Sequence, residues 1–279
     1  MKRIIIIVAL IFSGLTAFAQ SYFTVGQYNM RYDSSKDRDN GYGWELRSKS
    51  IIDMVNFEGW DIIGAQELLH NQMLDLKNGL DGYDYIGVGR NDGQTKGEYA
   101  AIFYKTSRMK CLENGQFWLS ETPDVPSYGW DADCRRTATW ALMKDKRNGK
   151  SFFFVNTHLD HKGVEARKNG LQLVIDKIAG MNPDGYPMVL TGDFNVLPDD
   201  ECLVDLDKQM ESARKIAEVT DNYTTYNSWG GNAPEKEYVI DYIYVSGFSA
   251  VPQFYTNLKP YADRQFISDH YPIVAVLCF

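Results

Sequence analysis

The fold of this chain is organised around Val189-Leu190-Thr191-Gly192-Asp193-Phe194-Asn195. The first three residues are apolar or β-branched and predict a buried strand. Gly192 permits a turn of the backbone that a side chain would resist, so a carboxylate and a carboxamide follow the strand on one face. Asp193 can serve as a metal ligand or a base, and Asn195 can donate to a phosphate oxygen or orient a water. An ordinary Asx turn is the alternative interpretation of this motif.

Similar buried strands recur along the chain, and helices with an apolar stripe lie between them. The predicted strands cover residues 22–30, 61–67, 98–104, 117–119, 137–143, 151–157, 237–245 and 273–277, and the predicted helices cover 48–57, 68–80, 165–179 and 202–210. Polar side chains stand at or beside the ends of these strands: Asn29, Glu67, Glu98, His158, Asp193, Asn195, Asp241, Asp269 and His270. We therefore expect one shared site at one edge of the sheets.

The first nineteen residues have the pattern of a signal peptide. Lys2-Arg3 is a basic start, an apolar run too short to span a bilayer follows, and Ala17-Phe18-Ala19 is an A-x-A cleavage site. We expect export to the periplasm or beyond the cell, with cleavage after Ala19. Residues 20–279 contain no linker, repeat or low-complexity tract, which favours a single domain.

Charge and cysteine content narrow the classes of function. Without Lys2 and Arg3 the chain has 27 basic and 37 acidic residues, a net charge of −10. An acidic surface disfavours broad binding to a long phosphate backbone, but it suits a site that collects divalent cations. The four cysteines have no metal-type spacing, so structural thiols or one disulfide are expected. No later segment is long and apolar enough for stable membrane insertion, and we expect a monomer.

Hydrolysis at phosphorus is the chemistry that needs this set of side chains. A hard divalent ion prefers carboxylate and carbonyl oxygens, and the pentavalent state needs donors around its oxygens. Imidazoles oriented by acidic partners can act as donors or as a base. The sequence has no G-x-S-x-G nucleophile motif and no H-E-x-x-H zinc motif. A metal-activated water is therefore the expected nucleophile.

Six short motifs in order resemble the endonuclease/exonuclease/phosphatase superfamily, the deoxyribonuclease I-like metal-dependent phosphohydrolases. They are Tyr-Asn29, Gln66-Glu67, Asn-Thr-His158-Leu, Gly-Asp193-Phe-Asn195, Asp241-Tyr-Ile and Ser-Asp269-His270. The resemblance covers nearly the whole chain after residue 19. It implies an α/β (α+β) fold, a four-layered sandwich of two mixed β-sheets packed face to face with helices outside.

The resemblance also implies a role for each matched residue. Asn29 and Glu67 would help hold Mg²⁺ or Mn²⁺, with Glu67 the main ligand, and Asp269 would bind or position the metal. The remaining roles are catalytic: Asp193 orients or deprotonates the water, Asn195 binds the scissile phosphate, His270 pairs with Asp241 as base or donor, His158 donates to the phosphate, and Glu98 orients His158. Whether one or two metals bind, and which group is the true base, stays open.

The chain departs from the family pattern at places that bear on the substrate. Arg31 stands where some repair nucleases of the family carry an acidic residue. Asp160-His161 is not general either; a solvated loop is the favoured interpretation, with a role near the substrate as the alternative. The loop 117–136 lies where family members vary, and we hypothesise that Arg135 or Arg136 contacts phosphate with its planar donor fork. Structural ion pairing is the equal alternative.

The predicted function is divalent-metal-dependent hydrolysis of a phosphoester. A phosphodiesterase or nuclease of the 3′–5′ exonuclease kind is the first expectation, resembling the deadenylase and nocturnin branch. A sugar or inositol phosphate phosphatase and a sphingomyelinase-like phospholipase C are the alternatives. The acidic composition favours small phosphate esters or short oligonucleotides. A catalytically silent binding protein is the alternative from a different class.

Overall fold

The computed structural model describes residues 21–235, 238–261 and 264–279. The predicted signal peptide, residues 1–19, lies outside the described residues. The strands are β1 (Tyr22–Asn29), β2 (Ile62–Leu68), β3 (Tyr83–Ile86), β4 (Tyr99–Lys105), β5 (Met109–Trp118), β6 (Thr137–Asp145), β7 (Ser151–His158), β8 (Met188–Asp193), β9 (Glu211–Ser212), β10 (Asp241–Ser246), β11 (Ala250–Thr256) and β12 (Ile273–Cys278). The helices are α1 (Ser35–Asp39), α2 (Trp44–Glu58), α3 (His70–Gly79), α4 (Val164–Met181) and α5 (Ala213–Ile216), with 3₁₀ turns η1 (Glu201–Leu203) and η2 (Ser228–Gly230).

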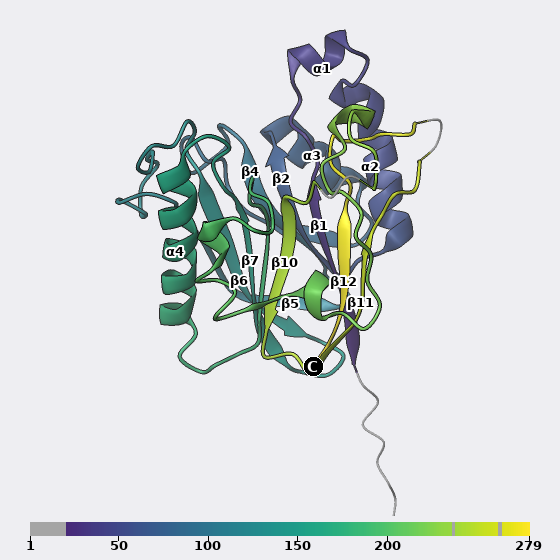
Figure 1. The fold of residues 1–279 in the computed structure, drawn as a ribbon. Coiled ribbons are helices and arrows are strands. Elements are labelled where there is room, and N and C mark those ends of the chain that lie inside the picture. The colour runs from purple at the N-terminus through teal and green to yellow at the C-terminus, as the bar shows by residue number, and fades with distance from the viewer. Residues whose placement is uncertain (1–20, 236–237, 262–263) are drawn as a thin grey trace, which may run out of the picture.

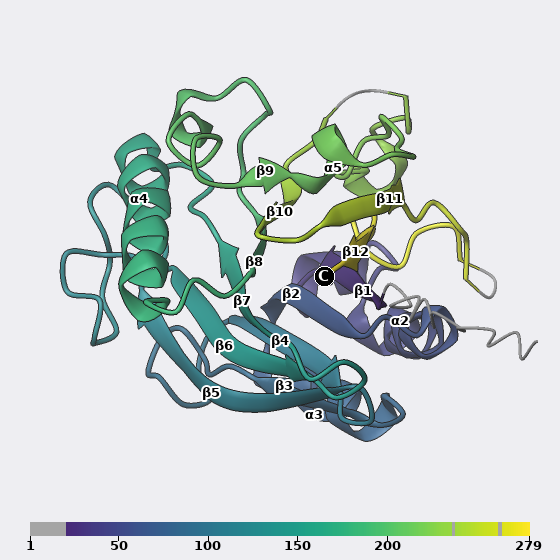
Figure 2. The same ribbon diagram turned by 90° about the horizontal axis from the view of Figure 1, so that it is seen from below.

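Two six-stranded sheets lie face to face (Figure 1). One has the order β11-β12-β1-β2-β4-β3 and the other β5-β6-β7-β8-β10-β9. Each sheet is mixed, because the central pairs β1–β2 and β7–β8 are parallel while the neighbouring pairs are antiparallel. Helices α2 and α3 flank the first sheet and α4 flanks the second (Figure 2). The predicted four-layered α+β sandwich is therefore confirmed.

Three apolar clusters correspond to the three contacts between layers. Side chains of both sheets, such as Phe23 and Phe154, fill the space between the sheets. A second cluster joins the outer face of the first sheet to α2 and α3, and a third joins the second sheet to α4. Leu171 and Val174 of α4 are fully buried. The helical spacing of the apolar residues predicts this burial.

Several sequence-based expectations are corrected. The helix predicted for 202–210 is wrong, because only the short η1 turn forms there. The strand predicted for 117–119 is the end of the ten-residue β5. The strand predicted for 237–245 begins only at Asp241 within the described residues from 238 on, and residue 237 lies outside them. Prediction missed α1, β3 and β11 altogether. These elements have little apolar periodicity of their own and are held by pairing or capping, as when Ser34 accepts a hydrogen bond from the N–H of Asp37.

A buried polar network joins the two sheets beneath the strand ends. Gln27 Nε2 donates to Gln66 Oε1 (2.8 Å) and to Asp241 Oδ1 (2.9 Å), and Gln66 Nε2 donates to Asn156 Oδ1 (2.6 Å). Gly64 permits this close approach, because a Cβ there would lie 2.6 Å from Asn156 Oδ1. A fully bonded buried network is rigid, so the sheets are held in one relative position where the strands end.

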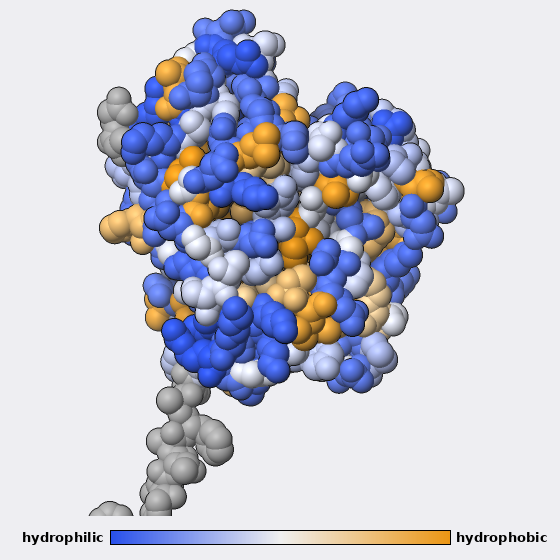
Figure 3. Space-filling view, turned by 180° about the vertical axis from the view of Figure 1, so that it is seen from behind, coloured by the Kyte–Doolittle hydropathy of each residue, from blue (hydrophilic) through white to orange (hydrophobic). Residues whose placement is uncertain are grey.

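Two further findings concern the surface and the thiols. Within the described ranges, none of the helices has the length and apolar character needed to cross a membrane. On the face seen in Figure 3, hydrophobic residues are interspersed among hydrophilic ones. All four cysteines lie in the described part of the chain and all four are free thiols, which agrees with the first of the two expectations, structural thiols, and not with one disulfide.

Candidate active site

A cleft of about 460 Å³ opens where the strands of both sheets end. Its floor and walls come from residues far apart in sequence: Arg31, Tyr32, Glu67, Arg90, Glu98, Cys134, Arg136, His158, His161, Asp193, Asn195, Tyr226, Tyr238, Ile240, Asp269 and His270. Asn29 and Asp241 lie directly behind this lining, at 0% and 1% exposure. The structure thus brings together the predicted site residues, with one exception, Arg135.

Asp193 lies between two imidazoles at the centre of the cleft. Its Oδ2 is 3.6 Å from His158 Nε2 and 3.7 Å from His270 Nε2. His270 Nδ1 is 2.8 Å from Asp241 Oδ2 on its other side. The pairing of β8 with β10 explains this arrangement, because Asp193 and Asp241 are direct partners in the register. A carboxylate between two rings is suited to receive or hold a proton.

The two histidines have opposite electrostatic environments. Burial acts to lower the pKa of His270, but the Asp241 carboxylate holds that pKa well above its ordinary value. Burial lowers the pKa of His158 well below its ordinary value, and Arg136 and Arg90 add to the effect. These shifts favour the cationic form of His270 and the neutral form of His158. Environments that separate two titratable groups in this way assign them different chemical roles.

Asn195 orients His158 in this structure. Its Nδ2 is 3.1 Å from His158 Nε2 and also donates to the carbonyl of Leu159 (3.0 Å). The His158 proton then belongs on Nδ1, whose nearest carboxylate is Glu98 at 4.0 Å. Because both amide hydrogens of Asn195 are engaged, the predicted contact between Asn195 and the scissile phosphate would require one of these bonds to break.

The carboxylates of Glu67 and Asp193 meet the His158 ring in the cleft, and the Asp269 carboxylate also lines it. Glu67, His158 and Asp193 offer ligand atoms within 4.8 Å of one another. Burial and the Asp241 charge raise the pKa of Asp193 to about 7, and burial raises the pKa of Asp269. Carboxylates whose charged form is disfavoured by burial and mutual repulsion are stabilised by a cation. The oxygen-rich donor set fits a hard divalent ion, and Asp269 lines the same cleft without belonging to that cluster.

Asn29 faces these carboxylates with its amide nitrogen. Asn29 Nδ2 donates to Glu67 Oε1 (3.0 Å) and to Asp193 Oδ2 (2.9 Å), while its Oδ1 accepts from the N–H of Arg31. In this arrangement Asn29 positions the two acids and does not present its oxygen to an ion. Burial acts to raise the pKa of Glu67, but the Arg31 guanidinium and the Asn29 amide hold it below its ordinary value.

Arg31 enters the cleft beside the proposed metal ligands. Its Nη1 lies 3.7 Å from Glu67 Oε2 and 3.6 Å from Asp269 Oδ2, and its Nε donates to Asp37 Oδ2 (2.8 Å). Arg31, Glu67 and Asn195 all have left-handed backbone angles, with φ of 57°, 66° and 54°. Strain of this kind persists where the surrounding structure holds the residue in place, and here it coincides with the cleft.

Two further arginines form the opposite wall. Arg90 makes a bidentate pair with Glu98, with both bonds at 2.7 Å. Arg136 is 5% exposed and lies 3.4 Å from Asp160 Oδ2, and its Nη2 is 3.1 Å from His161 Nδ1. Arg136 Nη1 has no hydrogen-bond partner among the described residues. A buried guanidinium nitrogen without a partner is costly and favours an incoming anion.

Arg135 differs from its neighbour. It is not among the residues that line the cleft, and its guanidinium carbon lies 4.5 Å from the centre of the Tyr128 ring. The predicted phosphate contact therefore stays a prediction for Arg136 alone, which lines the cleft. The solvated-loop interpretation of Asp160-His161 is wrong for Asp160, which is 1% exposed.

Sequence reasoning missed Arg90 and Tyr226 as members of the site. Arg90 stands in a polar loop without a motif, and only the fold brings it to Glu98. Tyr226 lies edge-on to His270, with ring centres 5.0 Å apart, and an isolated bridge pairs the two residues. Neither contact leaves a signal in the sequence, because each joins segments that are separate along the chain.

Asp160→Ala is expected to lower the free energy of unfolding by about 3 kcal/mol, since it leaves the Arg136 guanidinium buried without its counterion. The carboxylate also accepts from the N–H groups of Cys134, Lys162 and Gly163. Burial acts to raise the pKa of Asp160, but these N–H groups and Arg136 hold it well below its ordinary value. The contribution of Asp160 to the free energy of unfolding is therefore fully present above the ordinary aspartate pKa of about 3.9, and it is lost as the pH falls further.

Urea unfolding of the wild type and the variant between pH 8 and pH 3 measures this effect. The difference in the free energy of unfolding between the wild type and Asp160→Ala should be constant down to about pH 5 and should become smaller below about pH 4. Asp205→Ala is the control, because that carboxylate is 60% exposed and pairs with Lys208 at the surface. Equal stability of wild type and Asp160→Ala at pH 7 would contradict the prediction.

Comparison with known proteins identifies relatives of this chain. The model of the Endonuclease/Exonuclease/phosphatase family matches residues 26–270. The mannosyl-6-phosphatase of Bacteroides thetaiotaomicron is 39% identical, with 92% of this chain and 100% of that chain covered and a TM-score of 0.84. An endonuclease/exonuclease/phosphatase from Bacteroides vulgatus is 38% identical, covering 92% and 98%, with a TM-score of 0.86. The catalytic domain of human nocturnin, 19% identical with 93% and 97% covered and a TM-score of 0.67, shares the fold.

Proposed function

The chain belongs to the Endonuclease/Exonuclease/phosphatase family, whose members hydrolyse phosphoester bonds with a divalent metal, and from this premise we propose that it is a phosphomonoesterase acting on a sugar phosphate. The observation that carries the choice is the 39% identity, over 92% of the chain, to a mannosyl-6-phosphatase. This proposal replaces a nuclease as the first expectation. The human nocturnin catalytic domain, at 19% identity, shows a shared fold alone.

The charges around the cleft support a monoester. A phosphomonoester carries close to two negative charges at neutral pH, whereas a diester carries one. Arg31, Arg90 and Arg136 line the cleft beside the four carboxylates of Glu67, Glu98, Asp193 and Asp269, and protonated His270 adds a fourth cation. A dianion gains more than a monoanion from each of these cations. The net charge of −8 for the whole chain also disfavours a long polyanion as substrate.

Each residue then has a role in the reaction. Water attacks phosphorus, the ester P–O bond breaks, and the leaving sugar oxygen takes up a proton from solvent, so the products are inorganic phosphate and the sugar. Asp193 accepts the proton of the attacking water, and His270, held by Asp241, donates to a phosphoryl oxygen. His158 Nε2 accepts from Asn195 and faces Asp193, so the neutral ring positions these two groups, and its predicted contact with a phosphoryl oxygen would require a proton on Nε2. Glu67 and Asp269 would hold Mg²⁺ or Mn²⁺, which neutralises charge on the phosphoryl group.

Arg136→Ala is expected to raise the KM for a phosphomonoester by about tenfold or more, since a charge-assisted bond to phosphate is lost. Arg135→Ala is the matched control, because the neighbouring side chain packs on Tyr128 outside the cleft lining. Steady-state kinetics at saturating metal measure both variants. An unchanged KM and kcat for Arg136→Ala would show that this arginine has only a structural role.

The function is tested with an aryl phosphomonoester and an aryl phosphodiester, each with Mg²⁺, Mn²⁺ or EDTA. Metal-dependent cleavage of the monoester supports the proposal, and release of phosphate from mannose 6-phosphate and its epimers then defines the sugar. Cleavage of the diester alone would overturn it in favour of a nuclease or a phospholipase C. Metal binding without turnover of any phosphoester would indicate a silent binding protein.

A further inference from the structure

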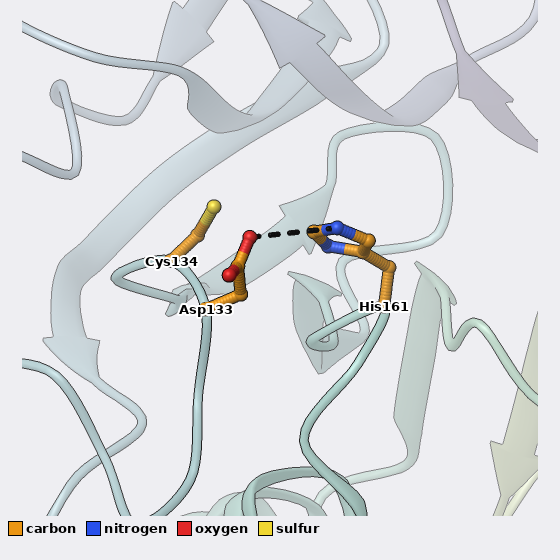
Figure 4. Close-up of side chains that lie close together, drawn as sticks. All are labelled: Asp133, Cys134 and His161. Atoms are coloured by element: carbon orange, nitrogen blue, oxygen red, sulfur yellow. Dashed lines mark ion pairs between the residues drawn. The ribbon is translucent and has the colours of Figure 1, made fainter.

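Three side chains of different donor types meet at the rim of the cleft and have no role in the reaction above. They are Asp133, Cys134 and His161 (Figure 4). Their carboxylate, thiol and imidazole ligand atoms lie within 4.8 Å of one another. The figure shows the thiol, the carboxylate and the ring turned toward a common space. Cys134 and His161 also line the cleft, so the cluster is open to solutes that enter it.

The cluster is held by a rigid frame. Asp160 is 1% exposed, and its Oδ2 accepts from the N–H of Cys134 at 3.1 Å. Its Oδ1 accepts from the N–H groups of Lys162 and Gly163 at 3.0 and 2.9 Å. One buried carboxylate therefore ties the loop that carries Asp133 and Cys134 to the loop that carries His161. A preorganised set of donors is what a metal site requires.

We propose that Asp133, Cys134 and His161 form a site for a thiophilic divalent ion such as Zn²⁺, separate from the hard cation site of Glu67 and Asp269. Sulfur and imidazole ligands select Zn²⁺ over Mg²⁺. Donor atoms around tetrahedral zinc are about 3.3 to 3.8 Å apart, given bonds of about 2.0 to 2.3 Å. Closing the cluster from its present spacing takes a shift of about 1 Å. The side chains of Asp133 and His161 are each 43% exposed, so water supplies the fourth ligand.

The neighbouring charges leave one face of the cluster free. Lys162 Nζ lies 3.1 Å from Asp133 Oδ1, which leaves Asp133 Oδ2 for the ion. That oxygen is 3.6 Å from His161 Nε2. On binding, the Cys134 thiol releases its proton to solvent, and the imidazole proton moves from Nε2 to Nδ1. Metal–sulfur, metal–nitrogen and metal–oxygen bonds form, and the oxidation state of the ion does not change.

Occupancy of this site is coupled to the phosphate side of the cleft. His161 Nδ1 now accepts from Arg136 Nη2 at 3.1 Å. Once that nitrogen carries a proton it can no longer accept, so Arg136 loses this contact when the ion binds. The guanidinium that faces the substrate is then free to change position. The binding itself is independent of the proposed activity, and only this coupling rests on it.

Titration with Co²⁺ tests the site, because a Co²⁺–thiolate bond has a charge-transfer band in the near ultraviolet that oxygen ligands do not produce. Reduced full-length protein should show the band at one equivalent of Co²⁺, and Zn²⁺ should displace it. Cys134→Ser should abolish the band, and His161→Gln should weaken Co²⁺ binding by more than tenfold. Cys111→Ser is the matched control, since that thiol lies outside the cluster, donating to the Glu113 carbonyl and accepting from the Asn114 amide.

Further measurements distinguish a failure of this metal site from a failure of the proposed function. Glu67→Gln should keep the band while losing the hard-metal site. Circular dichroism of Cys134→Ser and His161→Gln establishes that both variants are folded, and if one is not, the other carries the test. A missing band in the wild type, or a band that survives in Cys134→Ser, would overturn the site whatever the enzyme hydrolyses. Phosphomonoesterase activity with no band would leave the proposed function standing and remove this site.

Discussion

Asp193→Asn should lower kcat by about 10³-fold or more while the protein stays folded, because the amide cannot accept a proton from the attacking water. The carboxylate is 2% exposed and its Oδ2 lies within 3.7 Å of both His158 and His270. Burial and Asp241 raise its pKa to about 7, which suits a group that takes up a proton at neutral pH. The substitution keeps the size of the side chain, so packing around Phe194 is preserved.

Steady-state kinetics with saturating metal, together with thermal unfolding, measure this change. Asp124→Asn is the control for loss of one negative charge, since that side chain is 86% exposed. A variant with nearly normal kcat would exclude Asp193 as the proton acceptor. A variant with normal kcat but a raised metal requirement would indicate that Asp193 is a metal ligand instead.

Glu67→Gln should weaken divalent-metal binding by well over tenfold and should raise the metal concentration needed for half-maximal activity to the same extent. Substitution of a group that only supports a ligand costs about 10- to 100-fold, and loss of a charged ligand should cost at least as much. Glu67 is the carboxylate that both Asn29 and the N–H of Tyr32 hold in place. Its left-handed backbone, with φ of 66°, turns the side chain into the cleft.

Calorimetric titration with Mn²⁺, in the absence of substrate, measures the binding directly. Activity after EDTA treatment and return of Mg²⁺ or Mn²⁺ gives the second readout. Glu113→Gln serves as control, because Glu113 is exposed on β5 far along the chain from the motifs. Unchanged Mn²⁺ affinity in Glu67→Gln would contradict the assignment of Glu67 as the main ligand.

The arrangement also refines roles that motif order alone assigned. Asn29 and Asn195 were expected to contact metal and phosphate, yet their amide nitrogens are engaged with Glu67, Asp193 and His158. In this arrangement both side chains hold the groups that we expect to react. The roles of all the site residues stay predictions until the variants are measured.

Prediction from sequence succeeded where a local pattern has one dominant physical cause. The buried strand that leads to Asp193 is apolar and β-branched, so its burial and extended shape follow from composition. The strand ends at Asn29 and His158 share the same signal, and the order of the motifs was enough for the two-sheet fold. The prediction failed at residues 202–210, where the apolar residues Leu203 and Leu206 pack into the core from a series of turns.

Composition and periodicity thus account for the strands, the edge where the site lies and the residue types that meet there. They do not predict contacts between residues that are distant in sequence and become neighbours only in the folded chain. The contact of Arg136 with Asp160 and His161, the approach of Arg31 to Glu67, and the exclusion of Arg135 from the cleft all depend on packing between segments distant in sequence. A residue's neighbours along the chain determine its local conformation, whereas the charge and shape of a cleft arise only when the folded layers bring separate loops together.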